Sequence, residues 1–319
     1  ETEIRALVDD VIPVLAEGSV FGVNAGNGTI LWRQFVGYET THQPQWTDRI
    51  QKKNLLLCNQ QEHSLFCVDG LNGSLLWKSV VGQPFMQPTV VDGAIYLATK
   101  TGVVVRIDPY TGNKMAATQL PKKLLAPLEK AEGVPYIYAV AEDSNLYVLN
   151  AENLSCVEVF YIGHFPGSVT LAPVYWSGYL LVPVNGSDYC ELHVLKFAEK
   201  GLRADRAQVF RLADGPISLA PSRLGRWMLF LADNGEVKIL ELNTTEGEAP
   251  VRLIAEDKFE NRGRDRFYML AEGSSLWIAS KGLVRYGIQR TLGKFERENI
   301  ANPGDYFLAP LAKIGRAHV

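Results

Sequence analysis

The sequence lacks the features that mark most metal and redox sites. It has four cysteines in 319 residues, and no two of them stand next to each other or form a Cys-x-x-Cys pair. That spacing argues against a zinc site built from cysteine pairs, and a chain of this length does not imply a disulfide framework. The five histidines are scattered at spacings unlike those of paired metal ligands. We therefore expect no metal and no cofactor.

An excess of one charge is also missing. Lys and Arg number 32 against 35 Asp and Glu, so the chain has no strong basic field to attract nucleic acid or an anionic membrane. Residues 159–187 contain no charged side chain, as a membrane span would, but three prolines within them interrupt any single helix. We expect no nucleic-acid partner and no transmembrane segment. Because the first residue is Glu rather than Met, we expect a longer or processed chain.

Helical periodicity is hard to find, and a run of apolar residues followed by a turn recurs instead. Seven copies begin at residues 20, 65, 104, 146, 192, 237 and 283, at spacings of 39–46 residues. Prolines recur with a similar period, and RFYML at 266–270 takes the place of one that is missing. These prolines are Pro44, Pro88, Pro127, Pro173, Pro221 and Pro310. Two signals with one period of about 45 predict a repeat architecture.

Each repeat has the pattern of four short strands. Residues 86–120 show it best, with the runs MQPTVV, AIYLATK, VVVRID and KMAATQL separated by turns rich in Gly, Asp and Pro. Four strands in about 45 residues are typical of one blade of a β-propeller. We therefore predict an all-β chain, with residues 1–319 forming a single β-propeller domain of seven four-stranded blades.

The two ends of the chain are expected to share one blade. Residues 307–315, FLAPLAKIG, have the pattern of a first strand, and residues from 11 onward have that of the second to fourth strands. Pairing of these strands would close the propeller and remove its exposed sheet edges. In the alternative, residues 1–8 form their own first strand and residues 307–319 begin an eighth blade.

The turn that ends each repeat indicates which propellers this chain is similar to. WD40 repeats need Trp-Asp and kelch repeats need Gly-Gly, and neither dipeptide occurs. The stretches VNAGNGTILW at 23–32 and VDGLNGSLLW at 68–77 instead resemble the repeat of the pyrroloquinoline-quinone-like propellers, in which Asp-x-x-Thr-Gly-x-x-x-Trp closes a blade. A third copy matches at Asp108, Thr111 and Gly112 but has Ala116 in place of Trp. The match is strong only over residues 20–120, and the last four copies keep a degraded turn.

Structural roles explain this turn without a ligand. An Asp or Asn side chain caps the turn, Gly supplies a positive φ, and Trp can wedge between neighbouring blades. The residues concerned are Asn24, Gly28, Trp32, Asp69, Gly73, Trp77, Asp108 and Gly112. The same turn chemistry accounts for Asn-x-Ser/Thr triplets, although glycosylation of these asparagines stays open. The triplets begin at Asn27, Asn72, Asn153, Asn185 and Asn243.

The resemblance implies two classes of function. The family contains quinone-dependent dehydrogenases, whose marks include adjacent cysteines, and outer-membrane assembly lipoproteins that lack the quinone. Because adjacent cysteines are absent, we expect a non-enzymatic interaction or scaffold module with a protein or peptide partner. A quinone-dependent dehydrogenase-like or saccharide-acting enzyme with a divergent site is the alternative. The resemblance also favours a bacterial protein of the cell envelope, outside the cytoplasm, and leaves the oligomeric state open.

Binding residues are expected in the loops that lead into the first strand of each blade. In propellers these loops line one mouth of the central channel, which is a common binding surface. The loops are 36–46, 81–88, 162–173, 260–268 and 302–310. Their candidate residues are Tyr38, His42, Trp46, Phe85, His164, Phe165, Arg264 and Tyr306. The loop 36–46 combines Tyr, His and Trp within nine residues, so it is the strongest candidate.

Overall fold

The computed structural model confirms the all-β class. It describes residues 11–48, 53–163, 168–197, 204–243, 245, 248–258, 267–280, 282–289 and 294–301. These residues form strands β1 to β26 and one short 3-10 helix, η1 (Glu142–Ser144). The described residues divide into two compact units, one ending at Tyr161 and the other beginning at Ile162. The predicted single domain over residues 1–319 stays a prediction.

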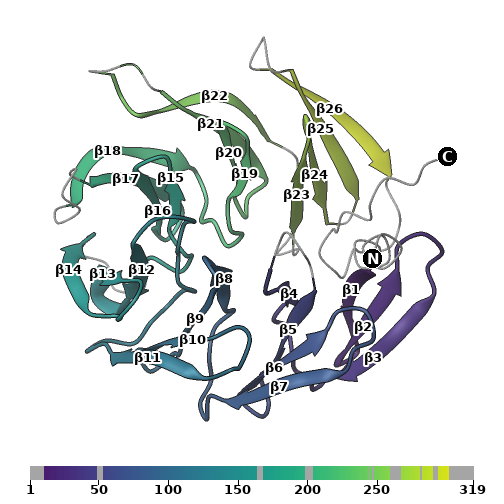
Figure 1. Ribbon diagram of the computed structural model, residues 1–319. Coiled ribbons are helices and arrows are strands. Elements are labelled where there is room, and N and C mark those ends of the chain that lie inside the picture. Colours follow the sequence, from purple (N-terminus) through teal and green to yellow (C-terminus); the bar gives the residue numbers. More distant parts are fainter. Residues whose placement is uncertain are drawn as a thin grey trace. The chain divides into compact units, whose positions relative to one another are not determined.

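The first unit holds four antiparallel sheets, each built from strands in chain order (Figure 1). The first sheet comprises β1 (Val11–Ala16), β2 (Ser19–Asn24) and β3 (Ile30–Phe35). The second comprises β4 (Gln45–Trp46), β5 (Asn54–Asn59), β6 (Ser64–Asp69) and β7 (Leu75–Val80). The third comprises β8 (Thr89–Val91), β9 (Ala94–Ala98), β10 (Val103–Ile107) and β11 (Lys114–Gln119), and the fourth β12 (Tyr136–Ala141), β13 (Asn145–Asn150) and β14 (Cys156–Tyr161).

The second unit holds three four-stranded sheets with the same topology. Its first sheet comprises β15 (Val174–Trp176), β16 (Tyr179–Asn185), β17 (Cys190–Phe197) and β18 (Ala204–Ala213). The next comprises β19 (Ser222–Leu224), β20 (Trp227–Leu231), β21 (Glu236–Leu242) and β22 (Val251–Lys258). The last comprises β23 (Tyr268–Glu272), β24 (Ser275–Ala279), β25 (Leu283–Gln289) and β26 (Lys294–Ala301).

These seven sheets within the described residues are the seven predicted blades. Each sequence copy of the repeat forms the next-to-last strand of its sheet, and the strands concerned are β2, β6, β10, β13, β17, β21 and β25. The first sheet has the three strands expected of the N-terminal part of a shared blade. Its predicted partner at 307–315 lies outside the described residues, as do the segments on which an eighth blade would depend.

The recurring prolines mark the start of first strands. Pro44, Pro88, Pro173 and Pro221 stand directly before β4, β8, β15 and β19. Proline is tolerated there because it has no N–H to contribute to the ladder. Pro127 is followed only by the isolated bridge of Glu129 with Tyr138, so the fourth sheet has three regular strands.

Apolar side chains fill the space between neighbouring sheets of each unit. Leu55 and Leu57 of β5 pack with Val20 and Trp32 of the first sheet. The alternate residues of β5, Leu56 and Cys58, pack toward the third sheet. A strand buried on both faces reads as a continuous apolar run, which explains LLLC at 55–58.

Candidate functional site

The turn between the third and fourth strands of a blade is held by one set of hydrogen bonds. In the second sheet, Asp69 Oδ1 accepts the backbone N–H groups of Leu71 and Asn72 at 2.9 and 3.2 Å. The N–H of Gly73, at φ +72°, donates to the Asp69 carbonyl at 2.8 Å. Asn24 and Asp108 make the equivalent bonds in the first and third sheets. The predicted capping role of these residues is confirmed.

The fourth copy keeps this turn although its sequence is degraded. Asn150 Oδ1 accepts from the N–H groups of Glu152 and Asn153 at 2.9 and 3.1 Å. Leu154 takes the place of Gly at φ +60°, and its N–H donates to the Asn150 carbonyl at 2.9 Å. The turn therefore keeps its conformation although its sequence departs from the motif. Burial of the Leu154 side chain in the core offsets the strain of the positive φ.

The tryptophans of the repeat join neighbouring sheets, as predicted. Trp32 Nε1 donates to the Gly70 carbonyl at 2.9 Å, and its ring packs on Gly73 of the second sheet. Trp77 Nε1 donates to the Pro109 carbonyl at 2.9 Å, and its ring packs on Gly112 of the third sheet. Each buried ring thus has its one polar atom satisfied, which is what a buried indole requires.

The middle asparagine of the turn also has a structural role. Asn27, Asn72 and Asn153 each accept a hydrogen bond from the backbone N–H two residues later, at 2.8–3.0 Å. This explains why Asn-x-Ser/Thr recurs at these three positions.

Tyr38 is the most exposed of the candidate binding residues that the structure describes. Its side chain is 77% exposed at the start of the loop 36–46. Its ring meets the ring of Phe35, itself 51% exposed, with centroids 5.2 Å apart in an edge-to-face arrangement. Phe35 is not among the binding residues predicted from the sequence. The sequence signal for it is an apolar residue at the last position of β3, directly before the loop 36–46.

Hydrogen bonds hold the rest of this loop firmly. Gln60 Oε1, in the turn between β5 and β6, accepts from the N–H groups of Thr41 and His42 at 2.5 and 3.3 Å. The Gln87 amide makes two bonds with the backbone of Gln43, at 2.8 and 3.1 Å, and so joins this loop to the loop 81–88. The two predicted loops therefore form one fixed surface.

His42 is half-buried in this surface as a neutral ring. Its centroid lies 5.4 Å from that of Phe85, and its Nε2 is 3.2 Å from Gln60 Nε2. Burial, and then the nearby charge of Lys100, lower the pKa of His42 from 6.5 to about 4. Because Gln60 Oε1 already accepts backbone bonds, its amide nitrogen donates to Nε2 of the neutral imidazole.

Phe85 is buried inside the fold, whereas Trp46 is only half-buried. Phe85 is 4% exposed and packs in the core between the second and third sheets. Trp46 is half-buried, and its ring lies against Gly70, where a Cβ would come within 2.4 Å of it. Both support the loops 36–46 and 81–88 from beneath. His164, Phe165, Arg264 and Tyr306 lie outside the described residues.

Titratable side chains do not gather into a metal site where the structure describes the chain. The residues from 11 to 301, less the gaps given above, contain no group of three His, Cys, Asp or Glu placed to hold an ion. The thiols of Cys58, Cys67 and Cys190 are buried, and burial raises the pKa of each to about 12. Cys156 lies in β14 and is exposed.

Comparisons with known proteins agree with the repeat. Residues 16–155 match the family model described as outer membrane protein assembly factor BamB. No curated protein matches the sequence. BamB from Moraxella catarrhalis is similar in structure, with a TM-score of 0.65 at 14% identity, over 91% of this chain and 85% of that one.

Solved WD40 domains show the same fold. The C-terminal WD40 domain of Sif2 gives a TM-score of 0.69 at 11% identity, over 91% of this chain and 82% of that one. The WD40 domain of Toxoplasma gondii coronin gives 0.64 at 8% identity, over 84% and 74%. In the residues that the structure describes, no helix is long and apolar enough to cross a membrane. The described residues thus form the seven blades of a β-propeller, four in the first unit and three in the second, and residues 16–155 match the repeat of the pyrroloquinoline-quinone-like propellers.

Proposed function

We propose that this chain is a non-enzymatic interaction module that binds a protein or peptide partner through the loop 36–46 and the loop beside it. The exposed aromatic pair of Tyr38 and Phe35 is the observation that carries the proposal. Large aromatic side chains that stand in solvent on a fixed backbone are typical anchors of protein interfaces. The likeness to BamB supports a scaffold, and it favours a place in the bacterial cell envelope.

The structure suits binding because the loop is held before any partner arrives. The bonds from Gln60 and Gln87 fix its backbone, and the half-buried rings of His42 and Trp46 fill the space beneath it. A surface already fixed in shape loses little conformational entropy on binding. The dehydrogenase-like and saccharide-acting alternatives gain no support from the side-chain groupings that the structure describes.

The test is site-specific photo-crosslinking in an extract of the source organism. A photoreactive amino acid replaces Tyr38, and in a matched control it replaces Tyr110, an equally exposed tyrosine (71%) in the turn before β11. We expect one distinct crosslinked protein from position 38 and none from position 110. The same adduct from both positions, or an adduct from position 110 alone, would contradict the proposal.

A further inference from the structure

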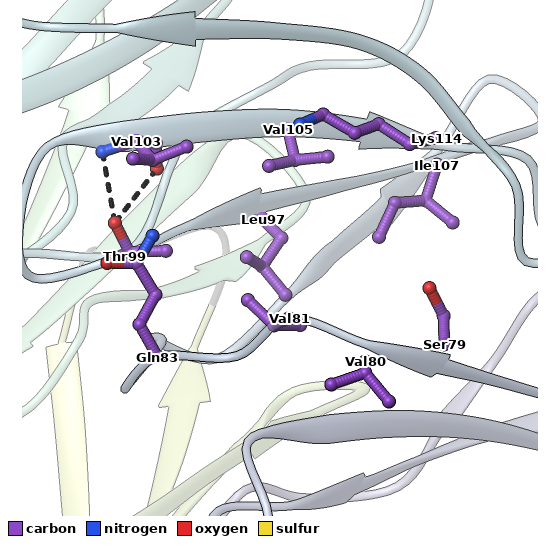
Figure 2. A pocket seen from close by; sticks show the side chains of 10 residues that line it. All are labelled: Ser79, Val80, Val81, Gln83, Leu97, Thr99, Val103, Val105, Ile107 and Lys114. Carbon is purple, nitrogen blue, oxygen red and sulfur yellow. Dashed lines mark hydrogen bonds between the residues drawn. The ribbon is translucent and has the colours of Figure 1, made fainter.

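A cavity of about 120 Å³ lies between the second and third sheets of the first unit. Leu97, Val105 and Ile107 of the third sheet form one wall, and Val80 and Val81, at the end of β7, form the other (Figure 2). Val80 is 71% exposed, so the cavity is bordered by a surface residue. We call it the β7–β10 slot.

The slot exists because one repeat position carries a smaller side chain in the third sheet. Val105 lies directly opposite Ala117 of β11, one residue before Arg106, after which the register of β10 shifts. The equivalent residues of the other sheets of this unit are Phe21, Phe66 and Tyr147, all aromatic. Phe66 is buried among Val36 and Leu57, where it fills the space between the first and second sheets. Valine leaves that space open.

A cation accompanies the aromatic ring at this position. Arg33 Cζ lies 5.6 Å from the centroid of Phe21, and Lys78 Nζ lies 5.7 Å from that of Phe66. In the third sheet, Lys114 lines the slot, and in Figure 2 its side chain extends toward Val105. Lys114 forms no ion pair with any residue in the described ranges. Arg33 and Lys78 lie directly opposite Phe21 and Phe66. The residue opposite Val105 is Ala117, so the cation at the slot comes instead from Lys114, three residues earlier in β11.

We propose that the β7–β10 slot binds an aromatic side chain of a partner segment that carries an acidic residue next to the aromatic one. The space between Val81 and Val105 corresponds to the one that Phe66 occupies in the preceding sheet, which specifies the ring. The unpaired ammonium of Lys114 attracts a carboxylate beside it. The slot shares Val81 and Gln83 with the loop 81–88 but no residue with the loop 36–46, so its test does not depend on Tyr38.

The first experiment titrates the protein with the blocked dipeptide N-acetyl-phenylalanyl-aspartate amide, followed by NMR of the valine methyl groups. We expect saturable shifts that include the methyls of Val105 and Val81. The leucyl-aspartate dipeptide should bind more weakly, as should the phenylalanyl-asparagine one. Lys114→Gln should weaken binding of the first dipeptide about two- to fivefold. An absence of saturable binding, or equal binding of all three dipeptides, would overturn the proposal.

One further variant fills the slot, and another opens a similar space between the first and second sheets. Val105→Phe should fill it with the protein's own ring, abolish dipeptide binding and raise the melting temperature by about 2 °C. Phe66→Val should open the same space between the first and second sheets. It lies beneath Lys78, whose Nζ is paired with Glu62 at 2.8 Å, so we expect a second but weaker binding site per chain. If Val105→Phe fails to fold, the number of dipeptide molecules bound per chain of Phe66→Val still tests the proposal. Dipeptide binding that persists in folded Val105→Phe, or one site per chain in Phe66→Val, would contradict the proposal.

Discussion

At the scale of single residues, the sequence predicted the turn chemistry well because the bonds are local. Asp69 and Asn24 accept from N–H groups two and three residues ahead, and such bonds depend on neither strand pairing nor packing. Leu154 could not be foreseen at a positive φ, because the burial that offsets its strain comes from residues distant in sequence. For the same reason the sequence did not place Phe85 in the core.

The repeated glycine offers a matched test of the tryptophan contact. Gly28 and Gly73 share φ +72°, but a Cβ on Gly28 meets nothing within 4 Å, whereas one on Gly73 comes within 2.8 Å of the Trp32 ring. Gly28→Ala should cost about 1 kcal/mol from backbone strain. Gly73→Ala should cost about 2 kcal/mol more, because the ring must move. Urea unfolding measures both, and equal losses would show that Trp32 does not fix this turn.

A buried ion pair allows a second test at this scale. The Lys130 side chain is 2% exposed, and its Nζ lies 2.6 Å from Asp92 Oδ2 in the turn between β8 and β9. Lys130→Met keeps the apolar stem but leaves Asp92 without its cation, so we expect a loss of about 2–3 kcal/mol in unfolding free energy. Lys122→Met breaks the exposed pair with Asp143 and should leave the unfolding midpoint unchanged. The reverse order would contradict this account.

At the scale of elements, the positions of the strands were easier to predict than which residues of the connecting loops are exposed. The runs at 94–100 and 103–108 match β9 and β10 because alternation and turn residues mark them locally. Which aromatic residue of the loop 36–46 would be exposed was not predictable. The contacts of Trp46 with Gly70 and of His42 with Phe85 join residues more than twenty positions apart.

The loop 36–46 should respond to acid through His42. The pKa of His42 is lowered from 6.5 to about 4, so the unfolded chain binds this proton more tightly than the folded chain does. The contribution of the neutral ring to stability is complete above pH 6.5 and is lost as the pH falls toward 4. His42→Gln should therefore flatten the fall in unfolding free energy between these pH values, measured by urea titration. An unchanged slope would show that His42 does not titrate in this range.

At the scale of the whole chain, the residues of the repeat support the fold, and the residues that we propose to bind a partner lie outside the repeat. The seven repeat copies became seven strands at equivalent positions of seven sheets, since a period of about 45 residues survives even where the turn sequence changes. The same side-chain hydrogen bonds recur at Asn24, Asp69, Asp108 and Asn150 and maintain the turns. The exposed pair of Phe35 and Tyr38 follows no such rule, so the repeat alone could not predict it.

One measurement tests this separation most directly: the affinity of the partner crosslinked at position 38 for two variants whose unfolding midpoints are also measured. We predict that Tyr38→Ala weakens binding about tenfold or more and keeps the midpoint of the unaltered protein. Gly73→Ala should lower the midpoint and, below its melting temperature, bind with unchanged affinity. Full affinity in Tyr38→Ala, together with weakened binding by folded Gly73→Ala, would place recognition in the repeat turns and contradict the account.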